Sequence, residues 1–397
     1  MGHVRALASA LTTLALLLAA CSQPEGEPDG LGPQEATPQP STRTGEPSDP
    51  EETEETEDPP ESTAPEEADD GPARPRVVGT VARNLVAPWG ITFLPDGTAL
   101  VSERDTTRVL AIPAGGGRPR EVGRLGIAAP QGEAGLLGLA ASPTYDEDKR
   151  VYAYVSTAED NRVVRMRYDG RRLGPARPVL TGIPNGFIHD GGRLLFADDG
   201  TLFVSTGETG EEHLAQDPDS LAGKILRITP DGDAPDDNPV EGSPVWTMGH
   251  RNVQGLAFDD DGRLWASEFG QNTWDELNLV SRGRNYGWPV HEGRAADRQD
   301  RYRDPFVQWR TSEASPSGLA FLDGSLWMAS LRGQRLWQVP VTNQGTGKPR
   351  DWFVGDYGRM RTVVVAPNGN LWVTTSNRDG RGDPAPQDDR ILEIALD

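Results

Sequence analysis

The chain has 397 residues and a formal net charge of −22, from 61 Asp and Glu against 39 Lys and Arg. Much of this charge lies in residues 22–76. Residues 77–397 carry 44 acidic and 35 basic residues without a basic stripe, which argues against nucleic acid as a partner. A single cysteine excludes a disulfide framework, so the folded part needs a large apolar core.

Residues 1–20 have the pattern of an export signal. A short basic start, Met1–Arg5, precedes an apolar stretch, Ala6–Ala20, that is too short to span a membrane as a helix. Cys21 follows directly in a small-residue context, which predicts lipidation of its thiol and an extracytoplasmic protein held at the cell membrane by an N-terminal lipid. The alternatives are a buried free thiol and an ordinary cleaved signal.

Residues 21–76 are predicted to be the lipidated cysteine and an acidic, proline-rich tether. Positions 22–76 contain seventeen Asp and Glu, three Arg, twelve Pro and no aromatic residue. Such a segment buries too little apolar surface to offset the entropy of ordering, so we expect it to be disordered. The folded domain is predicted to cover 77–397.

Residues 77–397 repeat one short pattern, an Asp-Gly or Asn-Gly pair followed by a strand. Copies lie at 95–103, 198–208, 260–268, 322–330 and 367–375, and a sixth at 145–156 has a longer acidic turn. The dipeptides favour type I′ hairpin turns, in which both central residues have positive φ. Each copy is followed by a further strand-like run, and six such units at a spacing of about 45–60 residues indicate propeller blades.

We therefore predict an all-β fold, a six-bladed antiparallel β-propeller. A strand at Val77–Arg83 is expected to join the last blade and close the ring. A seven-bladed ring and two separate domains are the alternatives.

Propeller geometry brings distant residues to one end of the axis. Residues just before each first strand and just after each second strand share a rim, because the two strands form a hairpin. Before the first strands stand Trp89, Glu133, His189, Arg251, Asn252, Ser315, Pro316, Arg359 and Arg361. After the second strands stand Glu103, Arg104, Glu208, Gly270, Gln271, Arg332, Ser376 and Asn377. Arginines and carboxylates with one histidine predict an anion site at this rim.

His189 is the candidate catalytic base. It directly precedes a first strand, and Glu208 ends the partner strand. A carboxylate bonded to one ring nitrogen fixes the tautomer and leaves the other nitrogen as a base near neutral pH. The alternative is a structural or solvated loop histidine.

The arginines are candidates for holding a polycarboxylate. Arg359 and Arg361 are separated by one residue and would point to the same side of an extended segment. Together with Arg251 and Arg332 they could bind carboxylates bidentately. The alternative is a set of rim salt bridges to Asp and Glu.

Two loops contain oxygen ligands of the kind that calcium prefers. Ser267–Glu276 offers carboxylates and main-chain carbonyls, although it has no fixed calcium-loop spacing. Asp231–Asp237 lacks the Gly and terminal Glu of an EF-hand, and we interpret it as a solvated acidic turn.

Residues 80–397 resemble the soluble pyrroloquinoline quinone (PQQ)-dependent aldose dehydrogenases, the glucose/sorbosone dehydrogenase family. The resemblance rests on the order and spacing of several motifs taken together. They are Gly-Leu-Leu-Gly-Leu at 135–139, His-Asp-Gly-Gly-Arg-Leu at 189–194, Leu-Ala-Gly-Lys-Ile-Leu-Arg-Ile at 221–228, Asp-Asp-Asn-Pro at 236–239, Gly-His-Arg-Asn-Val-Gln-Gly-Leu-Ala-Phe at 249–258, Asn-Tyr-Gly-Trp-Pro at 285–289, Ser-Pro-Ser-Gly at 315–318 and Arg-Met-Arg at 359–361.

The resemblance implies a role for each matching residue. His189 corresponds to the general base, and Glu208 to the acidic group that orients it. Arg251 and Asn252 correspond to the pair that faces the reactive carbonyl of the cofactor. Arg332, Arg359 and Arg361 correspond to further residues that bind the cofactor. Glu133 corresponds to a residue that contacts either the cofactor or the sugar.

The resemblance also implies two calcium sites. The main-chain carbonyls of Gly270 and Gln271 correspond to ligands of the calcium that binds with the cofactor. Glu276 and the Tyr286 carbonyl correspond to a second, structural calcium site.

Other positions depart from the family pattern. Ile188 replaces an Asp that precedes the general base in the glucose enzyme, and Ser376 lies near the position of another acidic cofactor contact. A second glutamine of the family corresponds to either His213 or Gln216. The insertions that shape the sugar cleft of the glucose enzyme are shortened here. The resemblance therefore implies PQQ and calcium but leaves the sugar open.

The implied function is an exported oxidoreductase that converts the C1 hydroxyl of an aldose to a lactone, with hydride passing to calcium-bound PQQ. A separate electron acceptor is needed, since the chain has no haem attachment motif and no second cysteine for a cluster. Two other classes stay open: a propeller lactonase, and a non-catalytic surface propeller that binds carbohydrate or protein.

Overall fold

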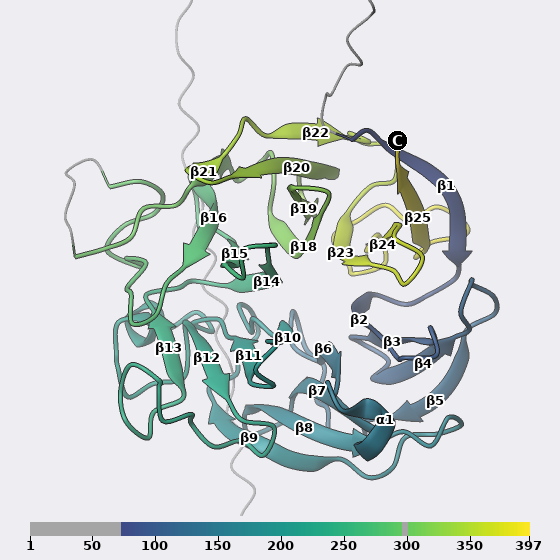
Figure 1. Cartoon of the computed structure of the whole chain (residues 1–397), viewed down its shortest axis with the longest axis horizontal. Coiled ribbons are helices and arrows are strands. Elements are labelled where there is room, and N and C mark those ends of the chain that lie inside the picture. Colours follow the sequence, from purple (N-terminus) through teal and green to yellow (C-terminus); the bar gives the residue numbers. More distant parts are fainter. Residues whose placement is uncertain (1–72, 296–300) are drawn as a thin grey trace, which may run out of the picture. The chain divides into compact units, whose positions relative to one another are not determined.

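The computed structural model describes residues 73–295 and 301–397, and these form the predicted six-bladed propeller. Six antiparallel sheets surround a central axis (Figure 1). Helical structure in these ranges consists of α1 (Tyr145–Asp148) and the 3-10 turn η1 (Glu212–Ala215). None of the helices in the described part of the chain is long and apolar enough to cross a membrane. The predicted signal, Cys21 and the tether to position 72 lie outside the described residues.

Each blade is a sheet whose strands follow the chain outward from the axis. Blade 1 consists of β2 (Pro88–Phe93), β3 (Ala99–Glu103), β4 (Arg108–Ile112) and β5 (Arg120–Arg124). Blade 2 consists of β6 (Leu136–Ala141), β7 (Arg150–Ser156), β8 (Asn161–Arg167) and β9 (Arg177–Ile183). Blade 3 consists of β10 (Leu194–Phe196), β11 (Leu202–Ser205), β12 (Lys224–Ile228) and β13 (Val245–Met248).

The second half of the ring repeats this order. Blade 4 consists of β14 (Val253–Phe258), β15 (Leu264–Glu268), β16 (Trp274–Val280) and β17 (Val307–Arg310). Blade 5 consists of β18 (Pro316–Leu322), β19 (Ser325–Ser330), β20 (Arg335–Thr342), β21 (Gly345–Thr346) and β22 (Arg350–Trp352). Blade 6 consists of β23 (Met360–Val365), β24 (Leu371–Thr375), β25 (Ile391–Leu396) and β1 (Pro75–Ala82).

Blade 6 closes the ring by joining the two ends of the described chain. Strand β1 pairs antiparallel with β25, as predicted, and begins at Pro75, two residues before the expected start. Main-chain hydrogen bonds in both directions between Arg74 and Asp397 extend the pairing beyond the strands. The last blade thus takes its outermost strand from the beginning of the described chain, which joins the ends of the ring.

The Asp-Gly and Asn-Gly turns confirm the hairpins but only one has the predicted type. Asp323 and Gly324 both have positive φ and form a two-residue turn between paired Leu322 and Ser325. In the other four turns only the glycine has positive φ; these are Gly97, Gly200, Gly262 and Gly369. Each of these turns has one residue more, so the type I′ prediction was wrong there, and the glycine instead completes a longer loop.

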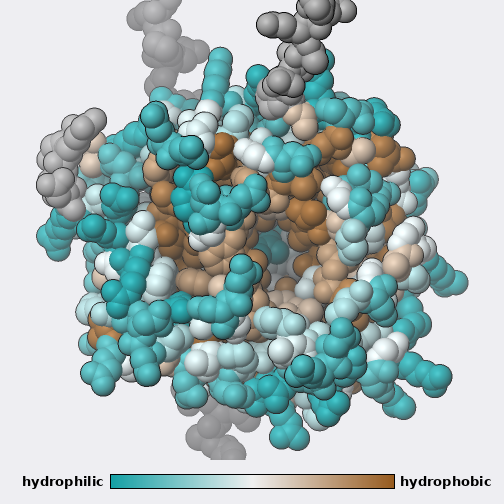
Figure 2. All heavy atoms as spheres, viewed as in Figure 1, coloured by the Kyte–Doolittle hydropathy of each residue, from teal (hydrophilic) through white to brown (hydrophobic). Residues whose placement is uncertain are grey.

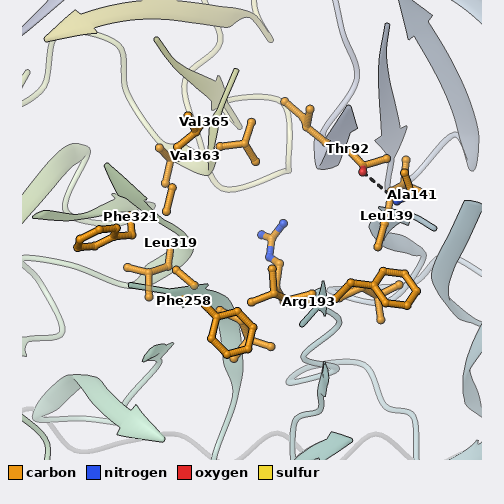
Figure 3. A pocket seen from close by; sticks show the side chains of 18 residues that line it. Thr92, Leu139, Ala141, Arg193, Phe258, Leu319, Phe321, Val363 and Val365 are labelled. Atoms are coloured by element: carbon orange, nitrogen blue, oxygen red, sulfur yellow. Dashed lines mark hydrogen bonds between the residues drawn. The ribbon is translucent and has the colours of Figure 1, made fainter. Parts of the chain in front are cut away.

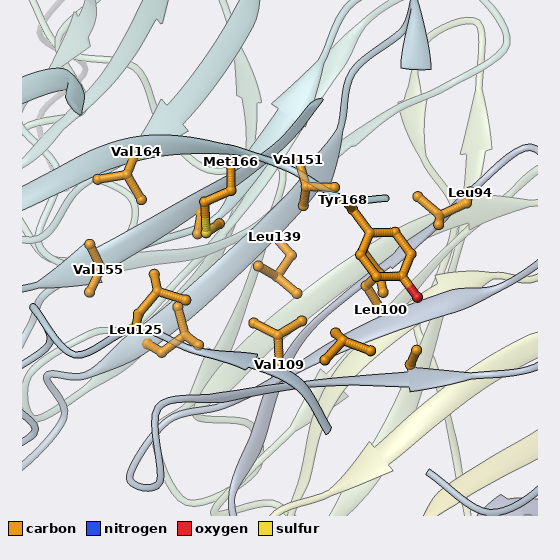
Figure 4. Close-up of a cluster of buried hydrophobic side chains, with 14 of the residues drawn as sticks. Leu94, Leu100, Val109, Leu125, Leu139, Val151, Val155, Val164, Met166 and Tyr168 are labelled. Carbon is orange, nitrogen blue, oxygen red and sulfur yellow. The ribbon is translucent and has the colours of Figure 1, made fainter. Parts of the chain in front are cut away.

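Apolar side chains fill the spaces between neighbouring blades. Figure 4 shows the cluster between blades 1 and 2, which includes Leu100, Val109, Leu139, Val151 and Val164. The second strand of each blade is buried on both faces, which explains why these strands are continuously apolar rather than alternating. Burying one such side chain is worth roughly 1.5–3 kcal/mol, and the clusters take the place of disulfides.

Four of the six blades have a glycine at the same position of the inner strand. A Cβ atom added at Gly90, Gly138, Gly255 or Gly318 would lie 2.2–2.8 Å from atoms of the next blade. The strands therefore approach one another most closely at this level of the channel. In the same register, Arg193 precedes β10 and Thr362 lies in β23.

Candidate active site

A cavity of about 280 Å³ lies at the rim where first strands begin and second strands end. Predicted rim residues that line it are Trp89, Arg104, Glu133, Ser315, Arg332, Arg359 and Arg361. Further lining residues are Gln254, Phe269, Leu331, Asp379 and Arg381. Five arginines against two carboxylates leave the lining with a surplus of three positive charges. The structure thus brings residues from distant blades together around a strongly positive cavity.

Arg359 and Arg361 share one carboxylate, that of Asp379. Nε and Nη2 of Arg359 donate to Asp379 Oδ2 at 3.0 and 2.9 Å, and Arg361 Nη2 donates to the same oxygen at 3.4 Å. Arg361 also donates to Gln254 Oε1 and to Ser376 Oγ. Burial lowers the pKa of Arg361 to about 10. One buried carboxylate cannot neutralise both guanidinium groups, so this corner favours an additional anion.

His189 and Glu208 form the predicted pair. His189 Nδ1 lies 2.7 Å from Glu208 Oε1, and both side chains are buried. The backbone is fixed as well, since His189 has a φ of 58° and its carbonyl accepts the Thr209 N–H at 3.1 Å. Glu208 Oε2 accepts the Gly210 N–H. His189 Nε2 makes no hydrogen bond within residues 73–295 and 301–397, so it is the nitrogen left for a substrate.

Arg251 stands beside this pair. Its Nε is 4.0 Å from Glu208 Oε1, too far for a hydrogen bond, and is buried without any hydrogen-bond partner in the described ranges. The guanidinium lies 5.4 Å from the Trp288 ring, whose main-chain carbonyl accepts Gln216 Nε2 at 2.6 Å. His213 is exposed and contacts Glu211 instead. Of the two sequence alternatives, Gln216 is the one connected to the site.

Glu133 connects the His189 group with the cavity. One of its oxygens accepts the His189 N–H at 3.1 Å, and the other accepts Arg381 Nη1 at 2.8 Å. Burial alone would raise the pKa of Glu133, but these two partners bring it below its usual value. Asn252 is buried and accepts the Gly191 N–H at 3.0 Å, so its side chain braces the loop that carries His189.

The loop that follows β15 has two carbonyl oxygens available to a cation. The Glu292 Oε1 atom accepts the four consecutive N–H groups of residues 271–274 at 2.7–3.1 Å. Asp275 accepts the Gly270 N–H at 2.8 Å. The carbonyl oxygens of Gly270 and Gln271 accept no hydrogen bond in the described part of the chain. Hard cations bind such oxygens, and Phe269 places the start of this loop at the cavity.

Glu276 lies in a separate buried acidic group. Its two oxygens accept the Gly293 N–H at 2.7 Å and Asn278 Nδ2 at 2.9 Å, and Asn278 also donates to Glu268. Burial, and then the neighbouring Glu268, raise the pKa of Glu276 to about 8. The Tyr286 carbonyl accepts no hydrogen bond in the described ranges. Within them, no group of three or more His, Cys, Asp and Glu side chains is arranged to hold a metal ion.

Asp379 and Arg381 are the charged lining residues of the cavity that the sequence did not reveal. They lie in the long connection between β24 and β25, which has no strand of its own. The sequence did contain one indication of them: position 376 is a serine near the place where the family has an acidic residue, so a carboxylate had to come from elsewhere. The Ser376 hydroxyl bonds to Asp379 Oδ2 at 3.2 Å, so the carboxylate is supplied three residues later.

The chain is similar to proteins of known family over most of its length. The Glucose / Sorbosone dehydrogenase family profile matches residues 85–383. The structure of the PQQ-bound form of an aldose sugar dehydrogenase from Streptomyces coelicolor is 50% identical, with a TM-score of 0.80, covering 82% of this chain and 100% of that one. A Thermus structure described as a putative oxidoreductase (glucose dehydrogenase) is 43% identical, with a TM-score of 0.75, covering 81% and 100%. Aldose sugar dehydrogenase YliI of Escherichia coli is 27% identical over 74% of this chain and 88% of its own length.

Proposed function

The chain belongs to the glucose/sorbosone dehydrogenase family, and from this premise we propose that it is a PQQ-dependent dehydrogenase of aldose sugars. The observation that carries the proposal is the excess of arginines over carboxylates around the cavity, which remains after Arg104 is paired with Asp105 and suits a polycarboxylate such as PQQ. The 50% identity with a protein whose structure contains PQQ supports the same cofactor.

The arginines of the cavity would hold the cofactor by its carboxylates. Arg359 and Arg361 share one Asp379 oxygen between them, and Arg332 has no ion pair in the described ranges, so all three have charge to offer. Glu133 would lie at the boundary between cofactor and sugar, because it contacts both Arg381 and the His189 backbone. Bound PQQ would supply an electrophilic quinone carbonyl that accepts hydride.

His189 would take the proton of the sugar C1 hydroxyl. Its Nδ1 is held by Glu208 at 2.7 Å, so Nε2 is the nitrogen free to act as base. Glu208 would stabilise the imidazolium that forms, because the carboxylate is buried and already oriented. The buried and unpartnered Nε of Arg251 would stabilise negative charge developing nearby, at no cost of reorganisation. The product of this chemistry is the sugar lactone.

Calcium would bind at the carbonyl oxygens of Gly270 and Gln271. The Glu292 carboxylate supports this assignment by fixing the loop through its N–H groups. A second calcium would bind at Glu276 and the Tyr286 carbonyl, where a cation would replace the proton of a carboxyl group with a raised pKa.

Reconstitution of the purified protein with PQQ and Ca²⁺, followed by dye reduction over a panel of aldoses, tests the proposal. We expect PQQ to bind tightly and one or more aldoses to be oxidised. Absence of both binding and turnover across the panel would refute it. Sugar binding without reduction of bound quinone would instead favour a non-catalytic binder, and lactone hydrolysis without PQQ would favour a lactonase.

We also propose that the protein is exported and anchored through lipid on Cys21. The basic start, the short apolar stretch and the cysteine that follows support this location. The acidic segment would separate the domain from the membrane and let it reach a separate electron acceptor, either diffusible or in the membrane.

A further inference from the structure

The central channel has a second cavity at its opposite end. It measures about 430 Å³ and is lined by residues toward the end of each of the six inner strands, whereas the first cavity lies where these strands begin. Every lining residue is apolar except Thr92 and Arg193. Figure 2 shows apolar residues around the central opening on the face seen there. We call this second cavity the apolar vestibule.

Arg193 lies in the centre of the apolar vestibule, as Figure 3 shows. Its Nε donates to the Gln254 carbonyl at 2.8 Å, its Nη2 donates to Thr362 Oγ1 at 3.3 Å, and its guanidinium lies 4.4 Å from the Trp89 ring. The side chain forms no ion pair within the described ranges, and Nη1 makes no hydrogen bond there. Burial, and then the like charge of Arg361, lower the pKa of Arg193 to about 9.

Arg193 is the one charged residue among the six residues that occupy equivalent positions in the inner strands of the blades. Four blades have glycine in this register because the strands approach too closely for a Cβ atom. The space left on the axis is filled by one long cationic side chain from blade 3. A buried cation without a counter-charge is costly, and neutral hydrogen-bond acceptors compensate it only in part. A bound anion would remove that cost.

We propose that the apolar vestibule binds a small amphipathic monoanion, with its charged group on Arg193 and its acyl or aryl body against the apolar walls. One cation and apolar walls fit a single carboxylate with a hydrocarbon body. They fit a polycarboxylate less well, because the cavity offers one cation only. The proposal goes beyond the dehydrogenase function, because the two cavities share no lining residue, although Arg193 contacts Trp89 and Gln254 of the first cavity.

Isothermal titration calorimetry of the purified full-length protein with sodium octanoate tests this proposal, with octan-1-ol as the uncharged probe. We expect one equivalent of octanoate to bind, and octanol to bind at least tenfold more weakly. No binding of octanoate, or equal affinity for the two probes, would overturn the proposal.

Two rim variants locate the bound probe. Val365 lines the vestibule and is 37% exposed, so it tolerates a polar side chain better than buried Arg193 tolerates replacement. V365E should weaken octanoate binding by about tenfold through like-charge repulsion, whereas V365Q should weaken it far less. Equal affinities of the two variants would place the probe elsewhere, for example at the arginines of the first cavity, and would refute the assignment. A crystal structure with octanoate should show its carboxylate on Arg193.

Discussion

Replacing Glu208 by glutamine should slow turnover while leaving cofactor binding nearly unchanged. Glu208 contacts His189 Nδ1 at 2.7 Å and is not among the residues that line the positive cavity. Glutamine keeps the size of the side chain and an oxygen that can accept the Nδ1 proton. The substitution therefore removes the charge that stabilises the imidazolium, and it also puts an amide group in place of the oxygen that accepts the Gly210 N–H.

The size of the effect follows from this contact. A hydrogen bond to a charged group is worth about 1.5–3 kcal/mol, and about 1.4 kcal/mol corresponds to a factor of ten. The expected loss in kcat is therefore about 10- to 100-fold, with a smaller change in KM because the charge matters most once His189 has taken up the proton. The Nε atom of Arg251, 4.0 Å from Glu208, would also lose its nearest counter-charge, which places the loss at the upper end of this range.

The assay is steady-state dye reduction by the protein loaded with PQQ and Ca²⁺, with PQQ affinity measured separately. The matched control is Glu211→Gln, since Glu211 also stands beside a histidine, His213, but the two side chains are exposed and 3.8 Å apart. The control should retain full kcat. Unchanged kcat in Glu208→Gln would remove this carboxylate from the mechanism, and an equal loss in both variants would show that the effect is not specific to the site.

The remaining predictions concern the positive cavity, the buried acidic group and the membrane anchor. Asp379→Asn should lower the Tm of the cofactor-free protein more than that of the PQQ-loaded protein in differential scanning fluorimetry, because a bound carboxylate replaces the lost counter-charge; equal losses would contradict this. The pKa of Glu276 is raised from near 4.5 to about 8, so the unfolded chain loses this proton at a lower pH than the folded protein does. The free energy of unfolding should therefore fall as the pH rises from about 4.5 to 8, by at most roughly 1.4 kcal/mol per pH unit. Glu276→Gln should flatten that slope in denaturant titrations, and Ca²⁺ should raise the Tm of the wild type more at pH 8.5 than at pH 6; a Glu276→Gln variant that keeps both effects would refute the assignment. Cys21→Ser should release the protein into the medium with unchanged turnover of a soluble dye, and a variant that stays membrane-bound would refute lipidation.

The fold was predictable because each blade carries its own local signal. Glycine at positions 97, 200, 262, 324 and 369 marks a turn in five blades, and the longer acidic turn before Arg150–Ser156 marks the sixth; a strand follows each turn. The number of blades then follows from counting these signals. The turn type was not predictable from the dipeptide alone, because loop length is set by the pairing of the flanking strands.

The site was predictable where it depends on strand ends and not where it depends on long connections. Arg359 directly precedes the inner strand β23 and Arg361 is its second residue, so the propeller geometry alone places them at the rim. Asp379 and Arg381 belong to a connection without strands, whose path is set by hydrogen bonds that no repeat encodes. Glu292 is similar, since its function depends on four N–H groups some twenty residues earlier.

Residues that differ between equivalent positions of the six blades point to requirements other than packing. Blades of one ring face nearly the same packing problem, so equivalent positions should carry similar residues unless another requirement intervenes. In the register where four blades have glycine, Arg193 and Thr362 differ, and these two side chains bond to each other across the channel at 3.3 Å. One position earlier, Arg361 stands where four other blades have Trp89, Leu137, Gly192 and Ser317 and blade 4 has Gln254, and it faces the positive cavity. If the two proposals hold, both arginines stand at places on the axis where the chain departs from the blade pattern and binds an anion.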